Sequence, residues 1–145
     1  MKTDLSVEGL RALYTKHNCQ PGHHGWYGEP TDPSKAGCAC PFGIVLYDLG
    51  VSSVEDIKAM AFITVAKTLG EECGEIKAFT SGYDRGPGAI CHPFDYLGAG
   101  YTPEQAAGCC ATFEQGQRVR AAFYAEAVDL EAIAEEEDDE DLDWT

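Results

Sequence analysis

The residues best suited to chemistry gather near the N-terminus, between positions 17 and 40. Cysteine and histidine recur there among Gly and Pro, as His17, Cys19, His23, His24, Cys38 and Cys40. Thiolate and imidazole are the usual zinc ligands in proteins, and a structural site takes four of them in a tetrahedron. The pattern therefore predicts that zinc holds this loop in order. Its ligands would be Cys19, His23, Cys38 and Cys40.

A simpler interpretation of this loop is also open. Free cysteine behaves as a small buried hydrophobe, and histidines in a polar loop can point to solvent. The spacing matches no standard zinc finger, because Cys38 and Cys40 are separated by one residue instead of two or more. Under this interpretation the loop holds buried thiols, exposed imidazoles and no metal.

Cys40 and His92 raise a second hypothesis, that of a cysteine-dependent enzyme. Cys40 precedes Pro41, which favours the first turn of a helix. At a helix N-terminus the dipole lowers the pKa of a thiol and favours the nucleophilic thiolate. Cys38 is the other candidate nucleophile. His92, His23 or His24 would act as the base, with Asp95 or Asp84 to orient it. The alternative is a cysteine that serves only as a structural residue at a helix start.

The C-terminal end of the chain is strongly acidic. Residues 126–145 hold eleven Asp and Glu and no Lys or Arg, whereas residues 1–125 carry a formal charge of only −4. The run from Glu135 to Asp141 consists of seven consecutive acids. Like charges this close repel one another, so we expect residues 135–145 to form a solvated, flexible tail.

We predict that this tail binds a partner protein with a basic surface, such as a nucleic-acid-binding protein. Charge would set the rate and orientation of the encounter, and a terminal tryptophan would add affinity. The predicted contacts are Asp138, Asp139, Asp141, Leu142 and Trp144. The alternative is a tail that only keeps the protein in solution.

Composition excludes several classes of function. The 145 residues carry a formal charge of −15, which argues against direct binding of nucleic acid. No apolar run is long enough to cross a membrane, so no membrane role is expected. The stretch from Tyr83 to Gly88 lacks the Lys-Ser/Thr of a phosphate-binding loop. Seven cysteines, an odd number, without a secretory leader favour a reducing cytoplasm.

The spacing of apolar residues predicts five helices, over residues 4–17, 41–49, 54–69, 71–83 and 103–134. Thr102-Pro103-Glu104-Gln105 is a capping box with proline at the first helical position. Gly116 either lets another helix approach closely or marks a break. Residues 18–37 and 84–100 are rich in Gly and Pro and are predicted to be two long loops.

No segment shows the alternation of apolar and polar residues that is typical of a β-strand, so the predicted fold class is all-α. Residues 1–134 would form one compact helical domain, followed by the acidic tail over 135–145. We predict a non-enzymatic cytoplasmic interaction module or inhibitor, with one binding surface on the body and another on the tail. A zinc-stabilised binding protein and a cysteine-dependent enzyme are the alternatives. No motif assigns a family, although the chain bears a general likeness to short helical proteins of phages and bacteria.

Overall fold

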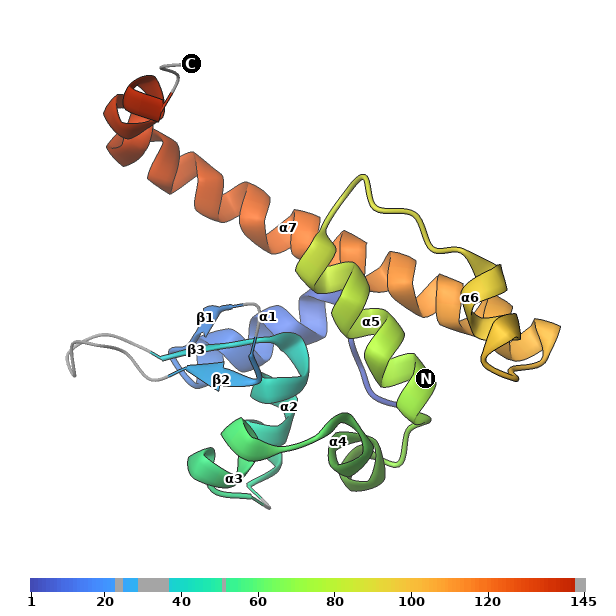
Figure 1. The fold of residues 1–145 in the computed structure, drawn as a ribbon. Coiled ribbons are helices and arrows are strands. Elements are labelled where there is room, and N and C mark those ends of the chain that lie inside the picture. The colour runs from blue at the N-terminus through green and yellow to red at the C-terminus, as the bar shows by residue number, and fades with distance from the viewer. Residues whose placement is uncertain (23–24, 29–36, 51, 143–145) are drawn as a thin grey trace.

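The chain folds into a mostly helical body with one small sheet, as seen in a computed structural model (Figure 1). The structure describes residues 1–22, 25–28, 37–50 and 52–142, and within these ranges it describes side chains as far as Phe123. The helices in these ranges are α1 (Val7–Lys16), α2 (Pro41–Leu49), α3 (Val54–Ala59), α4 (Phe62–Leu69), α5 (Cys73–Arg85), α6 (Pro93–Gly98) and α7 (Pro103–Leu142). The prediction of a mostly helical fold is confirmed.

The all-α prediction omits one small sheet, which lies in the first predicted loop. Three two-residue strands, β1 (Gln20–Pro21), β2 (Tyr27–Gly28) and β3 (Cys38–Ala39), form a sheet in the order β1-β3-β2. β3 pairs parallel to β1 and antiparallel to β2. Strands this short carry no alternation for a sequence pattern to detect. Their pairing supplies hydrogen bonds to backbone N–H and C=O groups of this segment, which would otherwise lack partners.

The helix predicted over residues 54–69 is in fact two helices. The backbone of Met60 is extended, and this residue ends α3. The indole N–H of Trp26 donates a hydrogen bond to the Met60 carbonyl over 2.8 Å, and its ring packs edge-on against Phe62 at 5.3 Å. A tryptophan from the first loop therefore occupies the break, which explains why the local pattern alone does not predict it.

The second predicted loop contains α6. Pro93 opens this helix with its fixed backbone angle, and Asp95 lies in the first turn, where it complements the helix dipole. The capping box before α7 is confirmed: Thr102 and Gln105 exchange side-chain-to-backbone hydrogen bonds of 2.9 and 3.1 Å. α7 then continues to Leu142, past residue 134, through residues such as Glu and Ala that favour helix.

Gly116 provides the close helix approach and does not break α7. α5 crosses α7 in the centre of the molecule (Figure 1). A methyl group on Gly116 would collide with the Phe79 carbonyl oxygen of α5, and one on Gly82 would collide with the Phe113 carbonyl oxygen of α7. The two backbones therefore touch through a glycine from each helix. This contact fixes the two helices on which the candidate site is built.

Candidate functional site

The cysteines of the first loop are divided between the surface and the core. Cys38 is exposed on β3, where a side-chain carbon on Gly28 would lie 3.0 Å from its sulfur. Cys19 is buried, and burial, followed by the neighbouring Cys38, raises its pKa to about 11. Cys19 directly precedes Gln20, which pairs with Cys38 in the sheet, so these two predicted zinc ligands lie near each other. A third predicted ligand, His23, lies outside the described residues.

Cys40, the fourth predicted ligand, serves as the N-cap of α2. Its sulfur accepts a hydrogen bond from the Gly43 N–H at 3.4 Å, and the residue belongs to the hydrophobic core. Burial raises the pKa of this thiol to about 12, so it stays protonated and non-nucleophilic at neutral pH. In the described ranges, no three His, Cys, Asp or Glu side chains lie close enough to hold a metal ion.

The predicted base, His92, lies at the surface. It is the exposed N-cap residue of α6, whereas Cys40 is enclosed beneath α2. Nucleophilic catalysis needs the base within hydrogen-bonding reach of the thiol. The burial of one residue and the exposure of the other favour a structural role for Cys40. The predicted tail contacts Asp138, Asp139, Asp141, Leu142 and Trp144 lie outside the residues whose side chains are described.

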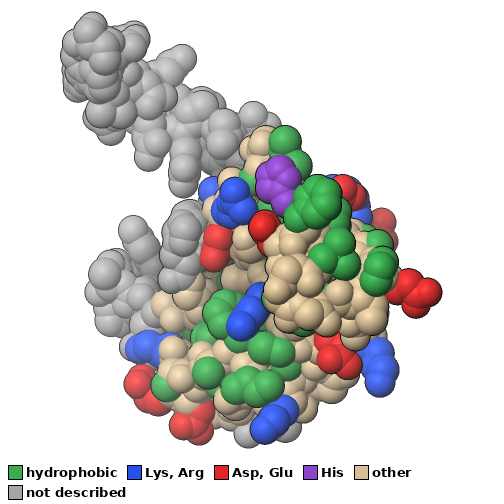
Figure 2. Space-filling view, turned by 45° about the vertical axis from the view of Figure 1, so that its right-hand side comes forward, with side chains coloured by type: hydrophobic (Ala, Val, Ile, Leu, Met, Phe, Trp, Pro, Cys, Tyr) green, Lys and Arg blue, Asp and Glu red, His purple; other side chains and the backbone are tan. Residues whose placement is uncertain are grey.

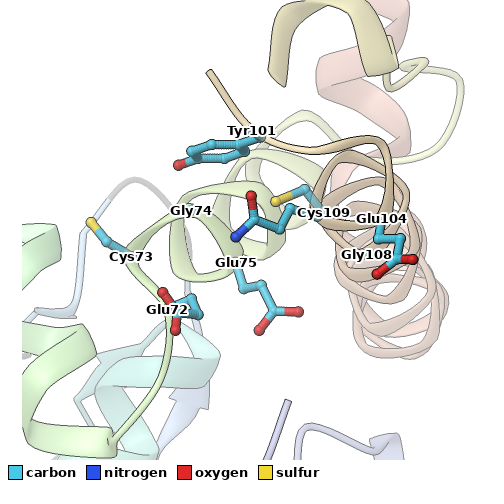
Figure 3. A pocket seen from close by; sticks show the side chains of 9 residues that line it. Glu72, Cys73, Gly74, Glu75, Tyr101, Glu104, Gly108 and Cys109 are labelled. Atoms are coloured by element: carbon cyan, nitrogen blue, oxygen red, sulfur yellow. The ribbon is translucent and has the colours of Figure 1, made fainter. Parts of the chain in front are cut away.

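A pocket of 390 Å³ opens where the start of α5 meets the start of α7 (Figure 3). We call it the acidic pocket. Three glutamates contribute to its lining, and no Lys, Arg or His does so. Its lining residues are Glu72, Cys73, Gly74, Glu75, Tyr101, Glu104, Gln105, Gly108 and Cys109.

The carboxylates of the acidic pocket are available for a cationic guest. No described Lys or Arg forms an ion pair with Glu72, Glu75 or Glu104. Burial, followed by the charge of Glu75, raises the pKa of the Cys109 thiol, so this side chain remains neutral. The Tyr101 ring forms an aromatic wall of the pocket (Figure 3). Carboxylates beside an aromatic face suit an ammonium or guanidinium group.

Large apolar side chains are exposed on α6 and just before it. We call Ile90, Phe94 and Leu97 the α6 surface; they are 67%, 80% and 38% exposed. Figure 2 shows hydrophobic side chains gathered next to a histidine on this part of the molecule. Tyr101 connects the two features, because it lines the acidic pocket and stacks on Tyr96 of α6 at 5.8 Å. An exposed phenylalanine with other exposed apolar side chains around it is suited to binding another protein.

Sequence reasoning misses both parts of this site. The Gly and Pro content of residues 84–100 predicts a loop and assigns no role to Phe94. A signal is nevertheless present: Pro93-Phe94-Asp95 combines a helix start with a large apolar residue. The acidic pocket has no such signal, because its glutamates come from two helices that meet only in the folded chain.

Comparisons of this chain with protein-family models, curated proteins and solved structures found no match. Across the described residues, none of the helices combines the length and the apolar character needed to cross a membrane.

Proposed function

We propose that the protein is a non-enzymatic interaction module that binds a partner protein through a segment carrying both basic and apolar side chains. The observation that carries this proposal is the exposed α6 surface, joined through the stacked rings of Tyr96 and Tyr101 to a pocket whose glutamates have no ion-pair partner among the described side chains. Apolar side chains of the partner would cover Phe94 and Ile90. A Lys or Arg of the same segment would enter the acidic pocket.

The energies of these contacts support such a mode of binding. Covering an exposed side chain such as that of Phe94 or Ile90 contributes about 1.5–3 kcal/mol. Each 1.4 kcal/mol changes affinity about tenfold, so a few such contacts give a specific complex. The charge of −15 attracts a basic partner at long range and speeds association. The acidic tail would add to this attraction.

A selection of random peptides displayed on phage tests the proposal and requires no candidate partner. We expect peptides selected on the wild-type protein to combine Lys or Arg with Leu, Ile, Phe or Trp. A parallel selection on a Phe94→Ala, Ile90→Ala double variant should not enrich them. Equal enrichment on both proteins, or selection of acidic peptides, would contradict the proposal.

The zinc-stabilised alternative retains one favourable observation. Cys19 directly precedes Gln20, which pairs with Cys38 in the sheet, so the two thiols lie close enough to influence each other and could share a metal ion. Cys40 is engaged in capping α2, so the remaining ligands would have to come from elsewhere, with His23 as the predicted candidate. Elemental analysis of protein purified without added metal tests this hypothesis, which requires one zinc per chain.

A further inference from the structure

A second hollow, of 440 Å³, lies between α5 and α6, and in contrast to the acidic pocket it is lined by two cations, Lys77 and Arg85, and one carboxylate, that of Asp95. Lys77, Ser81 and Arg85 line it from α5. Their spacing of four residues places them along one face of the helix, about 12 Å from first to last. Tyr101 separates this hollow from the acidic pocket, because it lines both.

The two cations of the hollow have no acidic partner among the described side chains. Neither Lys77 nor Arg85 forms an ion pair there, although the chain as a whole carries −15. The Arg85 guanidinium lies 5.8 Å from the ring centroid of Phe113, and the Lys77 ammonium lies 5.9 Å from that of Phe62. Both charges are held by aromatic rings, which leaves their hydrogen-bond donors open to a ligand.

The rest of the lining is mainly aromatic. Phe113 is buried at the hollow, and Tyr96 and Tyr101 stack on each other beside it. The exposed side chains of His92 and Asp95 also line it, from the start of α6. A cavity of this volume, with aromatic walls and a few polar groups, is of the size that binds small molecules.

We propose that the hollow between α5 and α6 binds a small organic anion, with one carboxylate or phosphate group on an aromatic body. Arg85 receives the anionic group through its planar pair of donors. Ser81, one turn earlier on the same face, donates a further hydrogen bond. The aromatic body packs against Tyr96 and Tyr101. Lys77 lies too far along the helix to share a compact anion with Arg85, and it adds to the local positive field.

Titration of four simple probes followed by NMR tests this site. Benzoate and phenyl phosphate carry the anion, whereas benzyl alcohol and benzylamine have similar rings without it. In ¹⁵N-labelled protein at physiological salt, we expect saturable shifts around α5 and α6 for at least one anion. That anion should bind about tenfold more tightly than benzyl alcohol, as expected for a charge-assisted hydrogen bond.

Arg85→Gln should weaken binding of the anion about tenfold, and Arg85→Lys should weaken it less, because it keeps the charge. Arg118→Gln is the matched control, because Arg118 is exposed on α7 and bonds only to Gln115 in the described structure. Thermal melts confirm that each variant is folded. Anions that bind no better than benzyl alcohol, or equally well to the folded Arg85→Gln variant, would overturn the proposal. Ile90 belongs to the α6 surface and also lines this hollow. The titrations contain no partner protein, so their results do not depend on the proposed function.

Discussion

The reactivity of each cysteine in this protein depends on how deeply its thiol is buried. Cys40 is enclosed in the core at the start of α2, and Cys38, two residues earlier, is exposed on β3. The sequence places both thiols near a helix start and cannot distinguish them. The fold distinguishes them, because Cys38 belongs to β3 and is exposed, whereas Cys40 is the N-cap of α2 and is buried. The same dipole that would activate an exposed thiol is outweighed here by desolvation.

We therefore expect Cys40 to be among the slowest thiols to alkylate in the native protein and Cys38 among the fastest. The nucleophile is the thiolate, and burial both raises the pKa of Cys40 to about 12 and blocks access to it. Brief treatment with iodoacetamide at neutral pH, followed by peptide mass spectrometry, measures both rates. Rapid alkylation of Cys40 would contradict this expectation and support the hypothesis of a cysteine-dependent enzyme.

The Glu71 carboxylate ties the N-terminus to the body. It accepts hydrogen bonds from the Thr3 N–H and hydroxyl, both at 2.6 Å, and from the Lys2 N–H at 3.2 Å. Burial alone would raise the pKa of Glu71, but the bonds from Thr3 and Lys2 outweigh it and lower the pKa below 4.5. Ionised Glu71 therefore stabilises the folded chain.

A Glu71→Gln variant should consequently be less stable than wild type at neutral pH. A lowered folded-state pKa gives stability that is present above the unfolded value of 4.5 and is lost as pH falls through the folded value. Thermal melts of both proteins from neutral to acid pH should show the difference in melting temperature shrinking in acid. A difference that stays constant with pH would show that the charge is not responsible.

The sequence predicts a helix boundary correctly where the capping residue is a neighbour in the chain. It does not predict a boundary that depends on a contact with a residue far away in the sequence. The capping box at Thr102 and the helix starts at Ser53 and Pro41 follow from neighbouring residues. The break at Met60 does not, because it depends on Trp26 from another segment. The sheet escapes prediction for the same reason. The two binding features are missed because each combines residues from different parts of the chain.

The crossing of α5 and α7 gives a direct test of this packing. Gly116→Ala places a methyl group against the Phe79 carbonyl oxygen, so we expect a loss of about 1–3 kcal/mol in the free energy of unfolding. Gly108→Ala is the matched control on the same helix, because its added carbon meets only the Glu75 side chain at 3.9 Å. It should stabilise the protein by about 0.5–1 kcal/mol through helix propensity. Urea unfolding curves measure both, and equal effects would contradict the close crossing.

At the scale of the whole molecule, charge is distributed unevenly along the chain. Removing residues 135–145 takes away eight acids and reduces the formal charge from −15 to −7. We expect a variant that ends at Ala134 to keep its melting temperature within a few degrees, because adjacent carboxylates are too costly to bury in a core. Differential scanning calorimetry of the two proteins tests this. A truncated chain that does not fold would show that the tail packs on the body.

If the α6 surface binds a partner segment, the affinity of a selected peptide must depend on Phe94. Isothermal titration calorimetry would compare wild type, Phe94→Ala and Ile63→Ala. Ile63 is the matched control, since it is also a large exposed apolar residue, 51% accessible, but lies on α4. We predict that Phe94→Ala lowers the affinity for the peptide at least about tenfold, because one apolar contact is lost. Ile63→Ala should leave the affinity unchanged. Equal affinities for wild type and Phe94→Ala would contradict binding at the α6 surface.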